Sequence, residues 1–164
     1  MEHVPAWAIL ALVTLQRLGE AAWARGNARL LLAQGGVEAG AGHFWPLIGL
    51  HAAWLAGLWF MAFDAPVSGG WLGLYLLLQV MRGWILWTLG RCWTTRIVVV
   101  PGEALVRRGP YRFLKHPNYA VLAAEVAVLP AVFGLWWYAA LFSAANLAVL
   151  ALRISVEDRA LGRS

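Results

Sequence analysis

Residues 44–63 form a run of twenty residues without a formal charge, in which His51 is the one ionisable side chain. A helix rises about 1.5 Å per residue, so roughly 20 helical residues cross the ~30 Å hydrocarbon core of a bilayer. Only helices and closed barrels span lipid, because every backbone polar group there has to be hydrogen-bonded within the protein. The run therefore predicts a membrane helix and constrains the rest of the chain to a helical membrane bundle.

Four further apolar segments accompany this run. The chain is 62% hydrophobic and 13% charged, against about 45–50% and 25% in soluble domains, so part of its solvent is lipid. Eleven Trp residues are typical of a protein with aromatic belts at the membrane interfaces. The last two segments are slightly short, and Gly134 between them allows only a tight hairpin. We predict an all-α membrane protein with about five transmembrane helices, at residues 4–24, 44–63, 71–90, 118–134 and 135–152.

Basic residues are concentrated in three of the regions that flank these segments. Eleven of the 13 Lys and Arg residues lie after the first segment, between the third and fourth, or after the fifth. Five crossings place these regions on one side, and the opposite side has Glu2 and Asp64 and no basic residue. The positive-inside rule predicts that the basic face is cytoplasmic and that the N-terminus lies on the opposite side. Basic clusters at helix ends suit lipid headgroups, so we expect membrane lipids and no nucleic acid as partners.

Length and cysteine content bound the organisation further. The 164 residues are expected to form a single domain, with a three-helix region at residues 1–90 and a motif-rich region at residues 91–164. Cys92 is the only cysteine, which excludes an intramolecular disulfide and a multi-cysteine metal site. We expect no metal. The first apolar run lacks a basic n-region and a cleavage site, so no cleavable signal peptide is expected.

The loop between the third and fourth segments carries the most specific pattern. Two short apolar runs, residues 96–100 and 104–106, flank a Pro-Gly pair and predict two extended arms joined by a turn. The loop ends in Gly-Pro-Tyr-Arg-Phe-Leu-Lys-His-Pro-Asn-Tyr, residues 109–119. Pro117 suits the first position of a helix, which places His116 at the cap beside backbone N–H groups that bind anions. The alternative for His116 is an interfacial ring whose hydrogen bonds are satisfied within the protein.

Polar side chains also follow one face of each of the last two segments. Asn146, Arg153 and Glu157 have offsets of 0, 7 and 11, which lie within about 20° of one line on a helix. The alternative for Arg153 and Glu157 is an i,i+4 salt bridge at a helix end. Glu125 lies seven residues after Asn118, on a shared face. A carboxylate inside lipid has to be paired, protonated or bound to a cation.

The first and third segments contain charges as well. Arg17 and Glu20 are three residues apart, so they can neutralise each other as a structural pair. The alternative is that they contact substrate. Arg82 interrupts the third segment and either extends to the interface or lines a cavity. Together with Glu125, we take Arg17 and Glu20 as candidate substrate-binding residues, because ionisable groups in membrane segments mark functional sites by default.

The combination of the 109–119 loop, a short helical hairpin, Asn146 and Arg153-Ile-Ser-Val-Glu157-Asp158 resembles the isoprenylcysteine carboxyl methyltransferase family. The close match covers roughly residues 91–161, and the N-terminal half also resembles the bacterial members. Two positions depart from the family pattern. Lys115 stands where Arg is expected and lacks its planar fork, and Asp158 shortens one side chain of a Glu-Glu pair.

The resemblance implies an integral enzyme of a bacterial inner or plasma membrane, with a pocket for S-adenosylmethionine at the cytoplasmic face. Arg153 and Asn146 would face the reacting centre as the catalytic residues. The residues that it implies at the cofactor are Val106, Gly109, Tyr111, His116, Pro117, Tyr119 and Glu157.

The acceptor stays open at this point. A carboxylate of the isoprenylcysteine type requires no general base, and Arg153 would orient it. A hydroxyl of a long-chain alkylresorcinol or alkylpyrone has to lose a proton, with His116 or Glu157 as candidate bases. Phospholipid N-methyltransfer is a close alternative. A small NADPH-dependent membrane reductase is another, because related sterol reductases contain a similar Gly-Pro-Tyr-Arg and His-Pro turn. A non-enzymatic assembly subunit explains the basic face but not the polar stripe.

Overall fold

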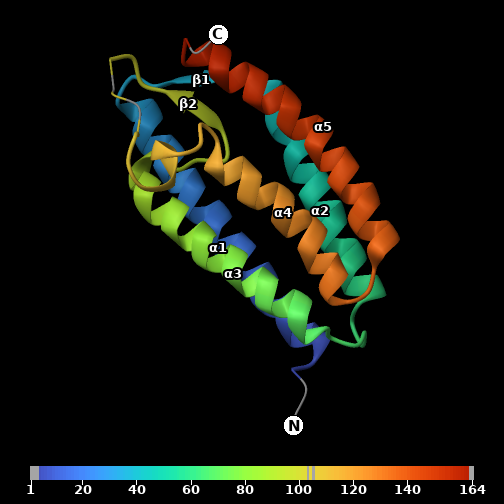
Figure 1. Cartoon of the computed structure of the whole chain (residues 1–164). Helices are drawn as coiled ribbons and strands as arrows, with labels where there is room; N and C mark the ends of the chain where they lie inside the picture. Colours follow the sequence, from blue (N-terminus) through green and yellow to red (C-terminus); the bar gives the residue numbers. More distant parts are fainter. Residues whose placement is uncertain (1–3, 103, 105, 163–164) are drawn as a thin grey trace.

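The computed structural model describes residues 4–102, 104 and 106–162, and helices make up most of it (Figure 1). The predicted all-α class is confirmed. Glu2, Leu105 and Arg163, to which parts of the sequence prediction refer, lie outside the described residues. The α-helices are α1 (Ala6–Ala33), α2 (Phe44–Met61), α3 (Gly69–Leu89), α4 (Pro117–Val132) and α5 (Trp136–Ala160). The connections contain the 3-10 helices η1 (Ala41–His43), η2 (Gly90–Cys92) and η3 (Gly109–Arg112).

Three helices of the described chain are long and apolar enough to cross a membrane: α2, α3 with η2, and α5. The 16 residues of α4 reach roughly 24 Å, less than the ~30 Å of a hydrocarbon core. The 28 residues of α1 are long enough, but this helix carries four charged side chains, Arg17, Glu20, Arg25 and Arg29. All five predicted segments are helical, whereas five membrane crossings are not confirmed.

Successive helices run in opposite directions, so the α1–α2 and α3–α4 connections and the end of α5 lie at one end of the bundle (Figure 1). We call this the basic end, because it contains the second half of α1 with Arg25 and Arg29, the α3–α4 connection with the cations of residues 91–115, and the last turns of α5 with Arg153. Helix α1 continues nine residues past its predicted end at residue 24, because Ala24, Ala28 and Leu31 keep one of its faces buried.

Helix α4 lies between α3 and α5 and is the most enclosed part of the bundle. Its buried face includes Val126, Leu129 and Val132, which belong to the main hydrophobic core. The predicted tight turn from α4 to α5 is present, and Gly134 in it has a φ of 73°, which favours glycine. This enclosure places Glu125, on the same helix, in the interior.

The two short strands, β1 (Val37–Ala39) and β2 (Ile97–Val99), pair with each other in antiparallel register. Val37 lies opposite Val99, and Arg96 forms a 2.9 Å ion pair with Glu38 on β1. The predicted extended arm at residues 96–100 is therefore a strand, but its partner is the α1–α2 connection. The predicted hairpin with residues 104–106 is not confirmed, since residues 104 and 106 have no strand conformation.

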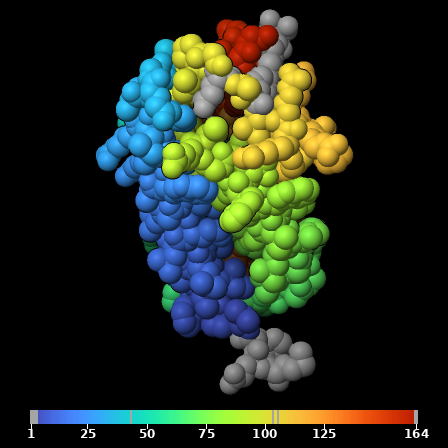
Figure 2. All heavy atoms as spheres, turned by 90° about the vertical axis from the view of Figure 1, so that its left-hand side faces the viewer, coloured from blue at the N-terminus to red at the C-terminus, as the bar shows by residue number. Residues whose placement is uncertain are grey.

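Large apolar side chains remain on the outside of the bundle. Phe60 on α2 and Trp87 on α3 are 89% and 87% exposed. Figure 2 shows α1 (blue) and α3 (green) side by side on one face of this surface. Extended apolar surface of this kind marks contact with lipid.

Candidate active site

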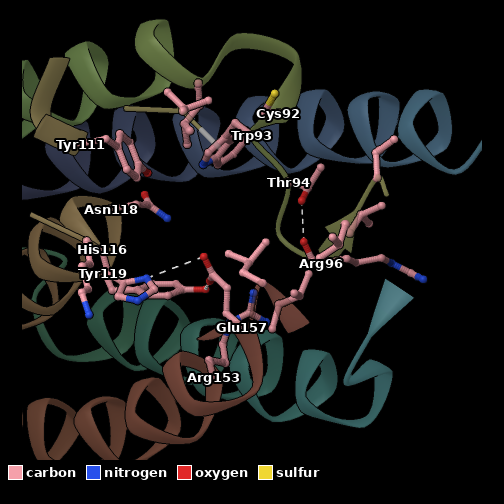
Figure 3. A pocket seen from close by; sticks show the side chains of 18 of the residues that line it. Cys92, Trp93, Thr94, Arg96, Tyr111, His116, Asn118, Tyr119, Arg153 and Glu157 are labelled. Carbon is pink, nitrogen blue, oxygen red and sulfur yellow. Dashed lines mark hydrogen bonds and ion pairs between the residues drawn. The ribbon is translucent and has the colours of Figure 1, made fainter. Parts of the chain in front are cut away.

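A cleft opens at the basic end, between the start of α4, the last turns of α5 and the segment that follows α3 (Figure 3). His116 and Tyr119 line it from α4, and Arg153 and Glu157 line it from α5. Residues 92–94 and 96–100, which include β2, form the facing wall. Asn118, Arg153 and Glu157 of the two polar patterns in the C-terminal helices thus lie at one place, whereas Glu125 and Asn146 do not line the cleft.

The turn before α4 is held against α3 by a close backbone approach. Gly109 has a φ of 57°, and a Cβ atom there would lie 2.6 Å from Oγ1 of Thr88. Only glycine satisfies both conditions without strain. Pro117 occupies the first turn of α4 and His116 is its N-cap residue, as predicted. Gly109 and Pro117 therefore shape the turn, and neither lines the cleft.

The His116 ring and the Tyr119 phenol bind two adjacent carboxylates of α5. Nε2 of His116 lies 3.0 Å from Oδ1 of Asp158, and its Nδ1 lies 3.7 Å from Oε1 of Glu157. The Tyr119 hydroxyl donates a 2.5 Å hydrogen bond to Oε2 of Glu157. The His116 and Tyr119 rings stack with centroids 5.6 Å apart. These contacts make one polar wall out of two helices. The ring hydrogen bonding considered as the alternative for His116 is therefore present.

Arg153 is buried and only partly satisfied by the protein. Its Nη2 donates a 2.8 Å hydrogen bond to the Thr95 carbonyl, and its guanidinium lies 5.9 Å from the centre of the Tyr119 ring. Its Nε has no hydrogen-bond partner among the described residues. The predicted alternative was a salt bridge between Arg153 and Glu157. The structure of the described residues does not contain this salt bridge. A buried donor without a partner is costly, which leaves Arg153 suited to receive a ligand.

Asn146 lies two turns deeper along α5. It is 0% exposed, and neither its amide nitrogen nor its amide oxygen has a partner in the part of the chain that is described. It is not among the described residues that line the cleft. Seven residues separate it from Arg153, which corresponds to roughly 10 Å along a helix. The polar face predicted for α5 thus continues from the cleft into the bundle.

The segment after α3 supplies site residues that the sequence analysis missed. Trp93 lines the cleft, and its buried Nε1 has no partner among the residues described. Asn27 on α1 fixes this segment by donating to the carbonyls of Trp93 at 2.8 Å and Gly90 at 3.1 Å. The available signal was the polar run Trp-Thr-Thr-Arg at residues 93–96, directly after an apolar helix. Of the predicted cofactor residues, Val106 and Tyr111 also line the cleft.

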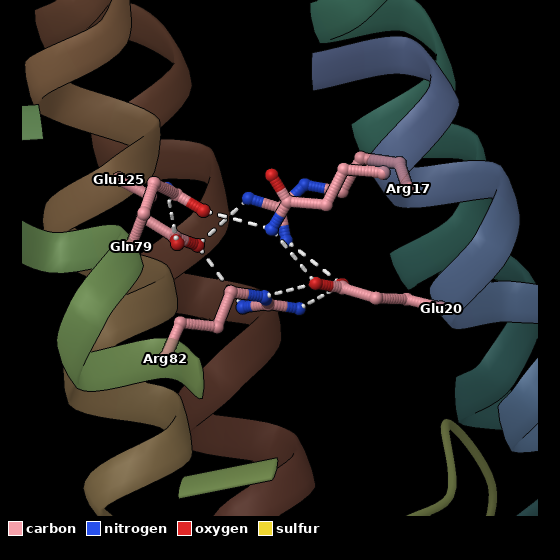
Figure 4. A network of polar contacts seen from close by, with 6 residues as sticks. Arg17, Glu20, Gln79, Arg82 and Glu125 are labelled. Carbon is pink, nitrogen blue, oxygen red and sulfur yellow. Dashed lines mark hydrogen bonds and ion pairs between the residues drawn. The ribbon is translucent and has the colours of Figure 1, made fainter. Parts of the chain in front are cut away.

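The three candidate substrate-binding residues lie elsewhere, in a buried network that joins α1, α3 and α4 (Figure 4). Arg17 contacts Glu20 at 3.2 Å and Glu125 at 2.8 Å. Arg82 contacts the same two carboxylates, at 2.5 Å and 3.0 Å. Gln79 donates to the other oxygen of Glu125 at 2.8 Å. The predicted Arg17–Glu20 pair is present, and Glu125 is paired.

This network contains two guanidinium groups and two carboxylates, so it is neutral as a whole. Every carboxylate oxygen of Glu20 and Glu125 accepts at least one hydrogen bond. Buried charges are tolerated when they are paired and hydrogen-bonded in this way. Arg17, Glu20 and Glu125 do not line the cleft, and their contact with substrate stays a prediction.

The cleft has the chemical groups that a charged nucleotide-like cofactor requires. Glu157 supplies negative charge, Arg153 supplies positive charge, and the Trp93 and Tyr119 rings supply aromatic surface. The enclosed space is about 180 Å³, below the ~300–1,000 Å³ of typical ligand pockets. A ligand that fills a typical pocket would therefore lie partly outside the cleft, at its open mouth. In the described part of the chain no group of His, Cys, Asp and Glu is placed to hold a metal ion.

The fold and the cleft define a helical membrane protein with a polar site at one end of its bundle. A family model described as the isoprenylcysteine carboxyl methyltransferase (ICMT) family matches residues 71–163, more than half of the chain. A curated relative, "Uncharacterized protein YpbQ" of Bacillus subtilis (strain 168), is 38% identical over 165 residues, which cover 94% of this chain and 95% of the relative. No solved structure matches the chain. The chain belongs to the isoprenylcysteine carboxyl methyltransferase family and is a membrane methyltransferase.

Proposed function

We propose that this protein transfers a methyl group from S-adenosylmethionine to an oxygen atom of a lipophilic acceptor. The observation that carries the proposal is the convergence of His116, Tyr119, Arg153 and Glu157 on one cleft at the basic end. These side chains come from two helices and from positions that the family resemblance assigns to the cofactor and the reacting centre. Membership of a methyltransferase family supports the same reaction.

The charged and aromatic groups of the cleft fit S-adenosylmethionine. The carboxylate of Glu157 suits its ammonium and sulfonium charges, and the basic residues around the cleft suit its carboxylate. When bound, the cofactor supplies a methyl group on an activated sulfonium. Trp93 lines the cleft and its buried Nε1 has no partner among the described residues, so pairing of this donor with a ligand would be favourable.

The residues of this chain act by binding and orientation. Holding two reactants in line supplies up to about 7–11 kcal/mol of a reaction barrier in well-oriented systems. The partnerless Nε of Arg153 would hold an acceptor oxygen, and the partnerless amide of Asn146, two turns deeper along α5, would contact the acceptor inside the bundle. If the acceptor is a carboxylate of the isoprenylcysteine type, these residues suffice. If it is the hydroxyl of an alkylresorcinol or alkylpyrone, His116 or Glu157 would accept its proton.

The proposal includes the placement of the protein in a bacterial inner membrane. We propose that all five helices are embedded there, with the short helix α4 enclosed by its neighbours. The basic end faces the cytoplasm by the positive-inside rule, which gives the soluble cofactor direct access to the cleft. The acceptor enters from the lipid, between helices. The exposed apolar surface of α2 and α3 supports this arrangement.

Two measurements on the purified, detergent-solubilised protein and its membranes test the function. S-adenosylmethionine and its demethylated product are expected to raise the melting temperature, and NADPH is not. Membranes incubated with radiolabelled methyl donor are expected to incorporate label into a lipophilic fraction. Base would release the labelled methyl group from a methyl ester but not from a methyl ether. Label on a phospholipid amine would instead identify N-methyltransfer. Stabilisation by NADPH would identify a reductase, and no response to either cofactor would favour an assembly subunit.

A further inference from the structure

A second hollow lies on the loop that precedes α4, and we call it the loop hollow. Three cations line it, Arg107, Arg112 and Lys115, together with the apolar side chains of Phe113 and Leu114. The three cations are exposed. Within the part of the chain that the structure describes, none of them forms an ion pair with a carboxylate. The positive charge of the loop hollow is therefore not compensated by those residues.

The apolar part of the loop hollow faces away from the protein. Phe113 is 78% exposed and Leu114 is 54% exposed. In Figure 2 the orange part of the chain, which contains this loop, stands out sideways past the green helix α3. Two adjacent exposed apolar side chains between cations are typical of segments that lie in the headgroup region, with the apolar groups at the acyl-chain boundary.

The position of the loop at the end of the candidate membrane helices agrees with this chemistry. The span of α3 and η2 ends at Cys92, and α4 starts at Pro117, so the loop begins and ends at the edge of the apolar bundle. Anionic lipids of the cytoplasmic leaflet attract basic segments at this depth. Arg side chains bind phosphate oxygens with paired, charge-assisted hydrogen bonds.

We propose that the loop hollow binds the headgroup of an anionic phospholipid. Arg107, Arg112 and Lys115 contact the headgroup phosphate, and Phe113 and Leu114 enter the acyl-chain boundary. Lys115 lines both the loop hollow and the cleft, so the bound lipid borders the candidate active site. This binding is separate from methyl transfer and does not depend on it. The occupant is a lipid and not free phosphate, because the exposed apolar pair has no role in binding a soluble anion.

Native mass spectrometry of the full chain in detergent, titrated with phosphatidylglycerol or phosphatidylcholine, tests the proposal. Phosphatidylglycerol is expected to bind more tightly than phosphatidylcholine. Each cation near the surface contributes about fivefold in affinity, so the double variant Arg107→Gln/Arg112→Gln is expected to weaken phosphatidylglycerol binding by roughly 25-fold. The matched control is Arg25→Gln/Arg29→Gln, which removes the same charge from exposed positions at the same end of the bundle. That control is expected to bind as the unmodified protein does.

Three results would overturn the proposal. The first is equal affinity of the unmodified protein for the two lipids, which decides the matter without any variant. The second is an equal loss of phosphatidylglycerol binding in both double variants. The third is displacement of the lipid by an equal concentration of inorganic phosphate, which would assign the loop hollow to a soluble anion. Melting temperatures of both double variants establish that they are folded.

Discussion

The Tyr119 hydroxyl donates a 2.5 Å hydrogen bond to Oε2 of Glu157, and this bond joins the first turn of α4 to the last turns of α5. The two residues are 38 positions apart in the chain. The bond holds the Glu157 carboxylate at the wall of the cleft, next to the stacked His116 ring. The geometry of the candidate cofactor site therefore depends on a contact between two helices.

Replacing Tyr119 with Phe tests this contact. A hydrogen bond to a charged group contributes about 1.5–3 kcal/mol, so Tyr119→Phe is expected to lower the melting temperature and to weaken binding of S-adenosylmethionine. Tyr138→Phe is the matched control, because it removes a neutral 2.9 Å bond to the Trp54 carbonyl, worth about 0.5–1.5 kcal/mol. Thermal unfolding and calorimetric titration in detergent measure the two effects. Equal loss of cofactor affinity in both variants would contradict the assigned role of Tyr119.

Glu157→Gln and His116→Ala are each expected to keep the fold and to weaken binding of S-adenosylmethionine. Loss of one charge-assisted hydrogen bond corresponds to roughly a ten- to hundredfold lower affinity. Asp64→Asn provides the control, since this exposed carboxylate lies in the connection between α2 and α3, at the other end of the bundle. Calorimetric titration of the three variants makes the comparison. Unchanged affinity in both site variants would rule out the proposed cofactor position.

Arg153→Lys retains the positive charge but loses the planar fork that orients an oxygen acceptor. We expect methyl transfer into the lipophilic fraction to fall by about 10–100-fold, the effect of one lost charge-assisted hydrogen bond, while cofactor affinity changes little. Arg159→Lys is the control, because Arg159 on the same helix is exposed and, among the described residues, its side chain bonds only to the Ser155 carbonyl of its own helix, at 3.0 Å. Radiolabelled methyl incorporation is the measurement. Full activity of Arg153→Lys would remove Arg153 from the reacting centre.

Glu125→Gln is expected to destabilise the protein by about 3–5 kcal/mol, because it leaves two buried guanidinium groups against one carboxylate. Glu38→Gln breaks the partly exposed pair with Arg96 and is expected to cost at most ~1 kcal/mol. The double variant Glu125→Gln/Arg82→Gln restores neutrality, so its loss of stability is expected to be smaller than the sum of the two single losses. Thermal unfolding in detergent measures all four variants. Additive losses would show that the network is not coupled.

Gly109→Ala is expected to be more destabilising than Gly102→Ala. Both glycines have positive φ, 57° and 84°, and an L-residue there costs about 1–2 kcal/mol. A side chain at Gly109 also meets Thr88, which adds roughly 1–3 kcal/mol of overpacking, whereas a side chain at Gly102 meets nothing within 4 Å. Melting temperatures of the two variants test the difference. Equal losses would mean that the turn does not pack against α3 as described.

The helices of this protein were largely predictable because their signals are local. Apolar segments of 18 to 20 residues identified α2, α3 and α5, and Pro117 identified the start of α4. The end of α1 was placed too early, because Arg25 and Arg29 interrupt the hydrophobicity of that segment. The signal for the continuation of α1 is the helical spacing of a few residues, and the structure buries these residues on one face of the helix. A continuous apolar run is a stronger signal than a half-buried amphipathic turn.

The candidate site was predictable in part. The helical spacing of Asn146, Arg153 and Glu157 predicted a shared face, and the resemblance placed that face near His116. Trp93 was missed because a single Trp after an apolar helix is equally typical of an interfacial belt. The pairing of β2 with β1 was missed for a similar reason, since a short apolar strand does not specify its partner.

The sequence by itself determined the helical membrane class, the common end of the basic connections and the polar faces of the last two helices. These properties follow from transfer of side chains between water and lipid and from the 3.6-residue period of a helix. Only the tertiary structure decided that Glu125 binds Arg17, 108 positions away, and Arg82, 43 positions away. A buried carboxylate requires a cation, but which cation it binds depends on how the helices pack around it.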